Sequence, residues 1–172
     1  MTMDIQSSNT VEAAASNESA TPTVYDGIAA FAAALGHHLG YSAWHTVSQQ
    51  QIDQFAEATG DHQWIHVDAE KAAKGPYGRT IAHGYLTLSL VPLLAKQIYQ
   101  VSGLAMGVNY GVDKLRFPAP VLVDSRIRAG AELIALDITG NRGRATVRFT
   151  VEVEGGDRPA CVVDSVALMV GE

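Results

Sequence analysis

Apolar and polar residues alternate along the last third of the chain, which is the pattern of β-strands with one buried face. The alternation is clearest over 144–154, where every second residue from Ala145 to Val153 is apolar. Similar runs cover 107–117, 125–138 and 159–170. Turn-forming residues at 140–143 and 155–157 separate the last three runs, so we expect an antiparallel meander.

The most apolar stretch of the chain, residues 84–100, has the length of a helix. Leucine, valine and alanine occupy nearly every side of it, and a helix that is apolar all round is a buried one. Such a helix needs apolar cover, which the strands that follow can supply. The pattern therefore predicts an α+β fold, in which a curved antiparallel β-sheet wraps around a long buried central helix.

Shorter elements precede this helix. Residues 42–47 alternate like a short strand, and Ser48 with Gln51 forms a capping box that begins the next helix. Gly60 is a typical residue to end that helix. Asp68 is placed to cap a further short helix within the long connection that follows.

The N-terminal region divides in two. Residues 1–23 are small and polar with almost no large apolar side chain, so we expect a disordered N-terminal tail. Residues 24–36 place apolar side chains at helical spacing and predict an extra N-terminal helix. Residues 24–172 should therefore form a single domain, with this helix at its beginning.

Composition narrows the classes of protein. The chain has 172 residues, a net charge of −6 and one cysteine, Cys161, which excludes an intramolecular disulfide. An acidic chain is unlike a nucleic-acid binder, and we expect none as partner. We also expect no membrane span, because no apolar stretch reaches the needed length, and no secretory signal, because the N-terminus lacks an apolar segment. A cytoplasmic location is the resulting expectation.

The chemically informative residues lie between 60 and 84. Asp61 and His66 are five residues apart and could converge on one water or substrate, since a carboxylate orients water and an imidazole exchanges protons near neutral pH. His83 and Gly84 stand at the start of the apolar helix, where free backbone N–H groups could hold a developing oxyanion.

Two alternatives remain open at these residues. Asp61 could cap the loop, His66 could be a satisfied core histidine and Gly84 could serve packing alone. A metal ion is also conceivable on His62, His66, His83, Asp61 and Asp68. The loop context set by Gly60 and the lack of a cysteine in the cluster disfavour it, so we expect no metal and no cofactor.

Three blocks carry a family resemblance, namely IDQFAEATGDHQWIHVDAEKAA, TIAHGYLTLSL and NYGVDKLRFPAPV. In this order they resemble the MaoC-like dehydratases, the (R)-specific enoyl-CoA hydratases of the hot-dog fold, with the NodN-like subgroup as the closer match. The sequence keeps Asp61, His66 and Asp68 of the family pattern Gly-Asp-x-Asn-Pro-x-His-x-Asp. It carries Gln63 and Trp64 where the family has Asn-Pro.

The resemblance implies a hydro-lyase of fatty acid metabolism that reversibly adds water to trans-2-enoyl thioesters, giving (3R)-3-hydroxyacyl thioesters. Asp61 and His66 would be the catalytic pair, and the Gly84 N–H would hold the thioester carbonyl, with His83 and Gln63 as further oxyanion or substrate contacts. Side chains that could contact the acyl chain or coenzyme A are Trp44, Trp64, Tyr77, Lys74, Arg79, Lys114 and Arg116.

Two other functions fit the same residues, a hot-dog acyl thioesterase and a non-catalytic acyl-thioester-binding accessory protein. The expected substrate carrier is coenzyme A or acyl carrier protein. A small sheet also leaves strand edges to cover, and hot-dog relatives pair edge to edge, so we expect a homodimer or a higher homo-oligomer.

Overall fold

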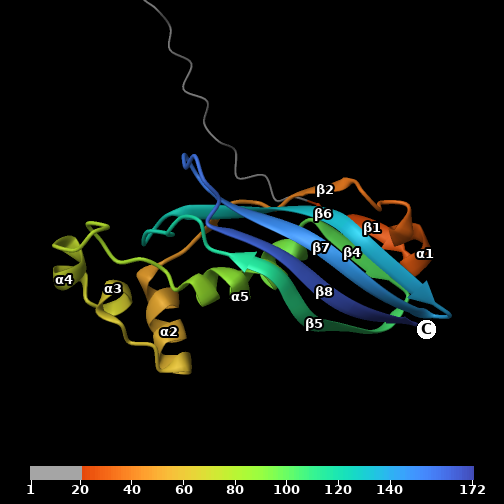
Figure 1. Ribbon diagram of the computed structural model, residues 1–172, viewed down its shortest axis with the longest axis horizontal. Coiled ribbons are helices and arrows are strands. Elements are labelled where there is room, and N and C mark those ends of the chain that lie inside the picture. Colours follow the sequence, from red (N-terminus) through yellow and green to blue (C-terminus); the bar gives the residue numbers. More distant parts are fainter. Residues whose placement is uncertain (1–20) are drawn as a thin grey trace, which may run out of the picture.

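The computed structural model describes residues 21–172, so the tail expected over 1–23 lies almost entirely outside the described residues. The main sheet is built from β2 His38–Tyr41, β3 His45–Thr46, β5 Leu104–Arg116, β6 Arg126–Thr139, β7 Arg142–Val153 and β8 Cys161–Gly171. Its order is β2-β6-β7-β8-β5, and β3 also pairs with β6 (Figure 1). The pairings of these described strands are antiparallel.

The meander expected from the alternation is confirmed in β6, β7 and β8. Phe149 on β7 lies between Ala131 on β6 and Val163 on β8, and all three are buried. The charged residues between the apolar positions of β7 lie on the opposite, outer face. The period-two pattern therefore correctly predicted both the strands and the face of each strand that is buried.

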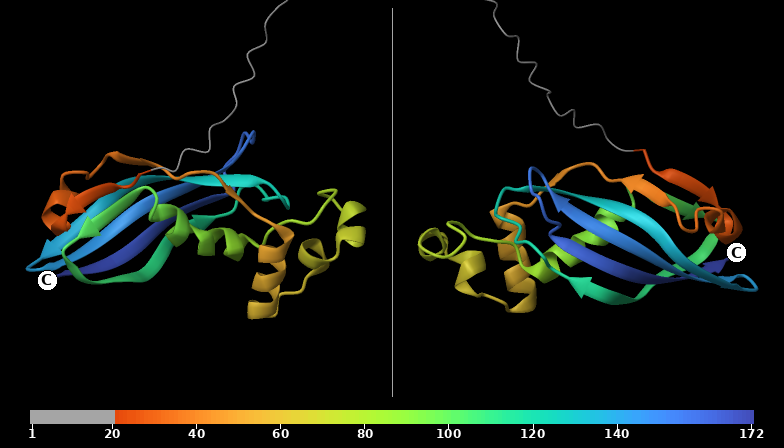
Figure 2. Two further views of the ribbon diagram at one scale, coloured as in Figure 1. Left: turned by 180° about the vertical axis from the view of Figure 1, so that it is seen from behind. Right: turned by 45° about the horizontal axis from the view of Figure 1, so that its top comes forward.

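The central helix α5, Gly84–Ala95, lies across the inner face of this sheet (Figures 1 and 2). Leu86, Leu90 and Leu94 are buried against it. The hot-dog arrangement of a curved sheet around a central helix is thus confirmed. No helix in the described part of the chain is long and apolar enough to cross a membrane.

The helix departs from expectation in two ways. It ends at Ala95 rather than at residue 100, because Tyr99–Ser102 form the strand β4. It is also not buried all round in the single chain, since Tyr85 is 66% exposed and Leu93 46% exposed. Its apolar outer side is therefore uncovered by the described residues of this chain.

The helix expected over 24–36 is present but much shorter than predicted. The segment begins with the strand β1, Thr23–Asp26, which pairs in parallel with β4, and only Gly27–Ala32 form the helix α1. Gly27 has a φ of 78°, a left-handed conformation that breaks the helical path after Asp26. The apolar residues of this segment still face one another without a continuous helix. Tyr25, in the strand, packs edge-on against Phe31 of α1, with ring centroids 5.1 Å apart.

The strand expected over 42–47 is also shorter, because β3 covers only two residues. The strand β2, which precedes it in the chain, pairs with the same strand β6. The helices α2 Gln49–Thr59, α3 Trp64–Val67 and α4 Ala69–Ala73 follow. They lie beyond the N-terminal end of α5 (Figure 1).

The cap positions of these helices are as expected, although the Gln51 side chain lies 3.2 Å from His45 Nε2 instead of completing the capping box with Ser48. Ser48 accepts from the Gln51 backbone N–H, Gly60 ends α2, and Asp68 accepts from the Lys71 backbone N–H. The one-turn helix α3, in contrast, was not expected in what looked like a loop.

Candidate active site

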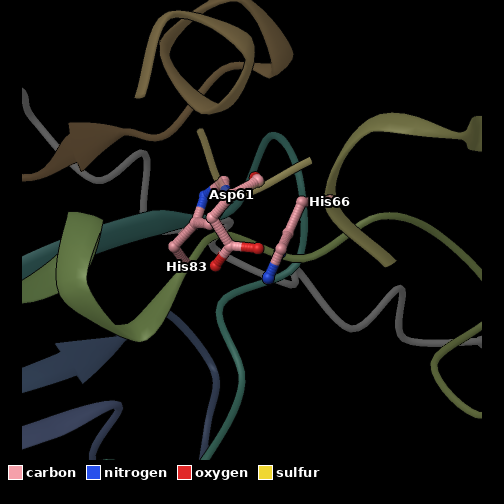
Figure 3. A group of neighbouring side chains, drawn as sticks. All are labelled: Asp61, His66 and His83. Carbon is pink, nitrogen blue, oxygen red and sulfur yellow. The ribbon is translucent and has the colours of Figure 1, made fainter. Parts of the chain in front are cut away.

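Asp61, His66 and His83 come together from separate segments at the N-terminal end of α5 (Figure 3). One polar atom of each side chain lies within 4.8 Å of the corresponding atoms of the other two. Asp61 follows Gly60, whose φ of 77° turns the chain out of α2. His66 lies in α3, and His83 directly precedes α5. The predicted pair therefore meets in space.

The three side chains differ in exposure. The rings of His66 and His83 are buried, whereas Asp61 is exposed. The Asp61 Oδ1 accepts from the Gln63 backbone N–H at 3.4 Å, which steadies the carboxylate at the beginning of α3. A carboxylate at the surface beside two buried imidazoles is a place where water or a substrate can reach the buried bases.

The surroundings of His66 fix its tautomer. Its Nδ1 lies 2.7 Å from the carbonyl oxygen of Ile81, which can only accept, so Nδ1 carries the hydrogen. In the neutral ring Nε2 then keeps a free lone pair. Burial of the imidazole, helped by the nearby His83, holds the pKa of His66 below its usual value of 6.5, although the Ile81 carbonyl and the Asp61 carboxylate act in the opposite direction. Near neutral pH, Nε2 is therefore available as a base.

His83 supports the other two residues. Its Nε2 donates to the backbone carbonyl of Asp61 at 2.9 Å, and its ring stacks on that of His66 with centroids 3.7 Å apart. The ring of Phe55 in α2 packs against the His83 ring, with the centroids 5.0 Å apart. The Nδ1 of His83 is buried and has no partner among the described residues. His83 thus connects the backbone at Asp61, through a hydrogen bond, to the imidazole ring of His66, through ring stacking.

The three side chains do not suit a metal ion. A metal lies in the plane of each imidazole that binds it, at ~2.0–2.1 Å from the nitrogen. The two rings are stacked at 3.7 Å with only 26° between their planes, so their lone pairs do not meet at that distance. The other metal candidates are engaged elsewhere, because His62 lies 3.8 Å from Glu57 and Asp68 caps α4. The arrangement fits a water molecule between a carboxylate and an imidazole.

A cavity of about 330 Å³ opens beside the first residue of α5. Its lining consists mostly of apolar side chains from the 81–87 and 117–121 segments, together with Tyr77 and Ala160. Gly84 contributes to the wall, and a Cβ at this position would lie 2.9 Å from the ring of Phe117. The first backbone N–H groups of α5 have no partner inside the helix, and they lie at its positive end.

The remaining predicted residues divide between the site and the surface. Tyr77 lines the cavity and Gln63 adjoins Asp61. Trp64 does not line the cavity, because its ring packs against Gly75 and lies under the Lys71 ammonium group.

The other predicted contact residues do not line the cavity. The Lys114 ammonium lies 4.0 Å from Asp164 on the outer face of the sheet. Arg116 is exposed, just before Phe117 of the cavity wall. Trp44 stacks on Arg128 at 4.7 Å, and Lys74 and Arg79 are exposed.

The sequence did not single out Ile81 or Phe117. Ile81 acts through its backbone carbonyl, for which a side chain gives no signal. Phe117 is far from Gly84 in the chain, and its contact arises only when the chain after β5 returns to α5. The sequence blocks that contain Gly84 and Phe117 were both recognised, but the contact between these two residues was not predicted.

The sequence and the fold resemble those of known proteins. The model of the MaoC like domain family matches residues 30–156. The chain is 52% identical over 147 residues to the Mycobacterium tuberculosis protein named 3-hydroxyacyl-thioester dehydratase Z, covering 85% of this chain and 97% of the relative. It is 42% identical over 138 residues to Nodulation protein N of Rhizobium leguminosarum, covering 78% and 86%. The solved (R)-hydratase from A. caviae involved in PHA biosynthesis has a TM-score of 0.63 at 26% identity, covering 77% of this chain and 94% of that one.

Proposed function

The chain belongs to the MaoC-like dehydratase family, and we propose that this hydro-lyase adds water to trans-2-enoyl thioesters to give (3R)-3-hydroxyacyl thioesters. The reverse dehydration uses the same groups. One observation carries the proposal: a neutral His66 with a free Nε2 and the Asp61 carboxylate meet beside the N-terminus of α5. The name of the A. caviae relative supports the (R) stereochemistry.

In the proposed reaction a water molecule lies between the two catalytic side chains. The Asp61 carboxylate accepts a hydrogen bond from one of its O–H groups, which stays intact, and so orients the water oxygen. The Nε2 of His66 takes the other hydrogen as a proton while the water oxygen forms its bond to C3 of the enoyl group. The lowered pKa of His66 keeps this nitrogen unprotonated at neutral pH.

The electrons displaced from the double bond move to the thioester oxygen, which becomes enolate-like. The Gly84 N–H at the positive end of α5 stabilises this charge. When the carbonyl re-forms, C2 takes the proton that His66 had removed from water. One water is added, and both catalytic side chains return to their starting protonation states.

The cavity beside Gly84 receives the acyl chain or the pantetheine arm. Most of its lining side chains are apolar and suit hydrocarbon, and Tyr77, which also lines it, is half-exposed and accessible to the substrate. Arg116, near Phe117, is the better placed of the two strand cations for a phosphate of the carrier, because Lys114 lies beside Asp164.

The active enzyme is a homodimer in this proposal. The outer side of α5 exposes Tyr85 and Leu93, and the edge strand β5 exposes Met106, Val108 and Tyr110. A groove of about 290 Å³ runs between the outer side of α5 and β5. A second copy that covers this surface would bury both the apolar helix side and the strand edge. A cytoplasmic location remains a prediction from the composition.

Incubation with crotonyl-CoA tests the reaction class. Loss of the enoyl absorbance without release of free thiol, with (3R)-3-hydroxybutyryl-CoA as product, is the expected result. Thiol release would instead identify a thioesterase, and binding without either change would identify an accessory protein. A product of (3S) configuration would overturn the stereochemical part of the proposal.

A further inference from the structure

We propose that Gln49 is a positioning residue that holds His66 in its reactive orientation through a hydrogen-bonded clamp. The inference rests on the role given to His66 in the proposed function. Gln49 is the first residue of α2, and its hydrogen bonds within the described chain involve neither the Asp61 carboxylate nor the His66 ring. It acts through the backbone segments that hold that ring.

The side-chain amide of Gln49 joins three segments. Its Nε2 donates to the backbone carbonyl of His66 at 2.8 Å and to Asp53 Oδ1 at 2.8 Å, while its Oε1 accepts from the Thr80 hydroxyl at 2.6 Å. If the amide were rotated by half a turn, its oxygen would face two hydrogen-bond acceptors, the His66 carbonyl oxygen and the Asp53 Oδ1. The chemistry of its neighbours therefore fixes its orientation.

Thr80 connects this clamp to the imidazole. It is 2% exposed, so its hydroxyl depends on Gln49 for a partner. The next residue, Ile81, accepts the Nδ1 hydrogen of His66, and its own N–H donates to Ile65 at 3.0 Å. Gln49 thus ties the backbone of His66 to the segment that orients its ring.

Loss of the clamp has a defined consequence. The His66 carbonyl and the buried Thr80 hydroxyl would both lack their partner, and water would enter to satisfy them. The ring would then sample positions other than the one facing Asp61. Displacement of a catalytic group by about 1 Å can cost ~10²-fold in rate even when the altered residue is remote from the reacting atoms.

The test compares Gln49→Met, which keeps the side-chain length but cannot donate or accept as an amide does, with Gln50→Met. Gln50 is the exposed neighbour on the same first turn of α2. In Gln49→Met we expect kcat for crotonyl-CoA hydration to fall about 10-fold or more, with KM changed less than about threefold, because positioning rather than binding is lost. Gln50→Met should match the wild type.

Two further readouts separate positioning from general damage. Entry of water would reduce the burial that lowers the pKa of His66, so the acid limb of the kcat profile should move to higher pH in Gln49→Met only. In ¹⁵N-histidine NMR spectra, the Nδ1–H signal that disappears in His66→Ala should exchange faster with water in Gln49→Met than in Gln50→Met.

Thr80 provides an independent arm. Thr80→Val should reproduce the Gln49→Met effects, Thr80→Ser should stay close to wild type, and the double variant Gln49→Met/Thr80→Val should be little worse than the worse single variant. Wild-type kcat, pH profile and Nδ1–H exchange in Gln49→Met would overturn the clamp, as would equal changes in Gln50→Met. If His66→Ala kept full activity, the proposed function would fail, while the NMR comparison would still decide the clamp.

Discussion

His66 donates its Nδ1 hydrogen to the backbone carbonyl of Ile81 at 2.7 Å, and this contact leaves Nε2 as the ring nitrogen with a free lone pair. Ile81 also lines the cavity beside Gly84. The segment that accepts from His66 is therefore also part of the wall of the proposed acyl site. Orientation of the base and shape of the cavity are coupled through one stretch of backbone.

The lowered pKa of His66 predicts the pH dependence of the reaction. A base must be unprotonated, so kcat/KM for hydration should fall as pH decreases through the pKa of His66. Because burial holds this pKa below 6.5, the midpoint of the acid limb should lie below 6.5. Initial rates with crotonyl-CoA across pH 4.5–8.5 (roughly ±2 units around the ordinary histidine pKa) measure it. A midpoint above 6.5, or the same limb in His66→Ala, would contradict this role.

Gly84→Ala should impair the site through Phe117. The new Cβ would lie 2.9 Å from the ring, so either the ring or the first turn of α5 must shift. A shift of the Gly84 N–H weakens oxyanion stabilisation, and we expect kcat to fall by about 10²-fold. Steady-state kinetics measure the loss. The double variant Gly84→Ala/Phe117→Leu should recover part of the activity; if it recovers none, the steric explanation is wrong.

His83→Phe should slow the reaction while preserving the fold. Phenylalanine keeps a ring against His66 and Phe55 but cannot donate to the Asp61 carbonyl, so the Asp61 segment loosens. We expect kcat to fall about 10-fold. Thermal unfolding monitored by circular dichroism supplies the control for folding. A variant with wild-type kcat would show that the hydrogen bond to Asp61 has no part in positioning.

The sequence predicted the features that depend on local pattern. Alternation located β7 and β8, and cap residues such as Ser48 and Gly60 gave the ends of α2. It failed where partners distant in the chain decide the structure. β1 and β4 form because they pair with each other, and this pairing replaced the helix expected at residue 24 and shortened α5.

The candidate site follows the same division. Asp61, His66 and His83 stood out as residue types in a fixed pattern, and they do lie together. Gln49 and Thr80 did not stand out, because a glutamine at a helix start and a threonine in a loop are common surface residues. Their hydrogen bond exists only once α2 lies beside the segment before α5.

The uncovered side of α5 predicts self-association. Light scattering at micromolar concentration should give at least twice the chain mass of 18.3 kDa. Leu93→Glu would place a charge on the exposed apolar helix side and should shift the protein toward monomer. Leu35→Glu, at a similarly exposed leucine outside α5 and β5, should leave the mass unchanged. A monomeric wild-type protein would refute the proposed dimer.

Asp61→Asn tests the catalytic pair most directly, because asparagine keeps the shape of the side chain but has lost the charge of the carboxylate. Asp61→Asn and His66→Ala should each lower kcat for crotonyl-CoA hydration by at least ~10²-fold, and the double variant should be little worse than the worse single one, since the two residues act as a unit. The decisive measurement is the hydration rate of Asp61→Asn at an unchanged melting temperature. We predict a loss of at least ~10²-fold; near wild-type turnover would mean that the Asp61 carboxylate is structural and that Asp61 and His66 are not the catalytic pair.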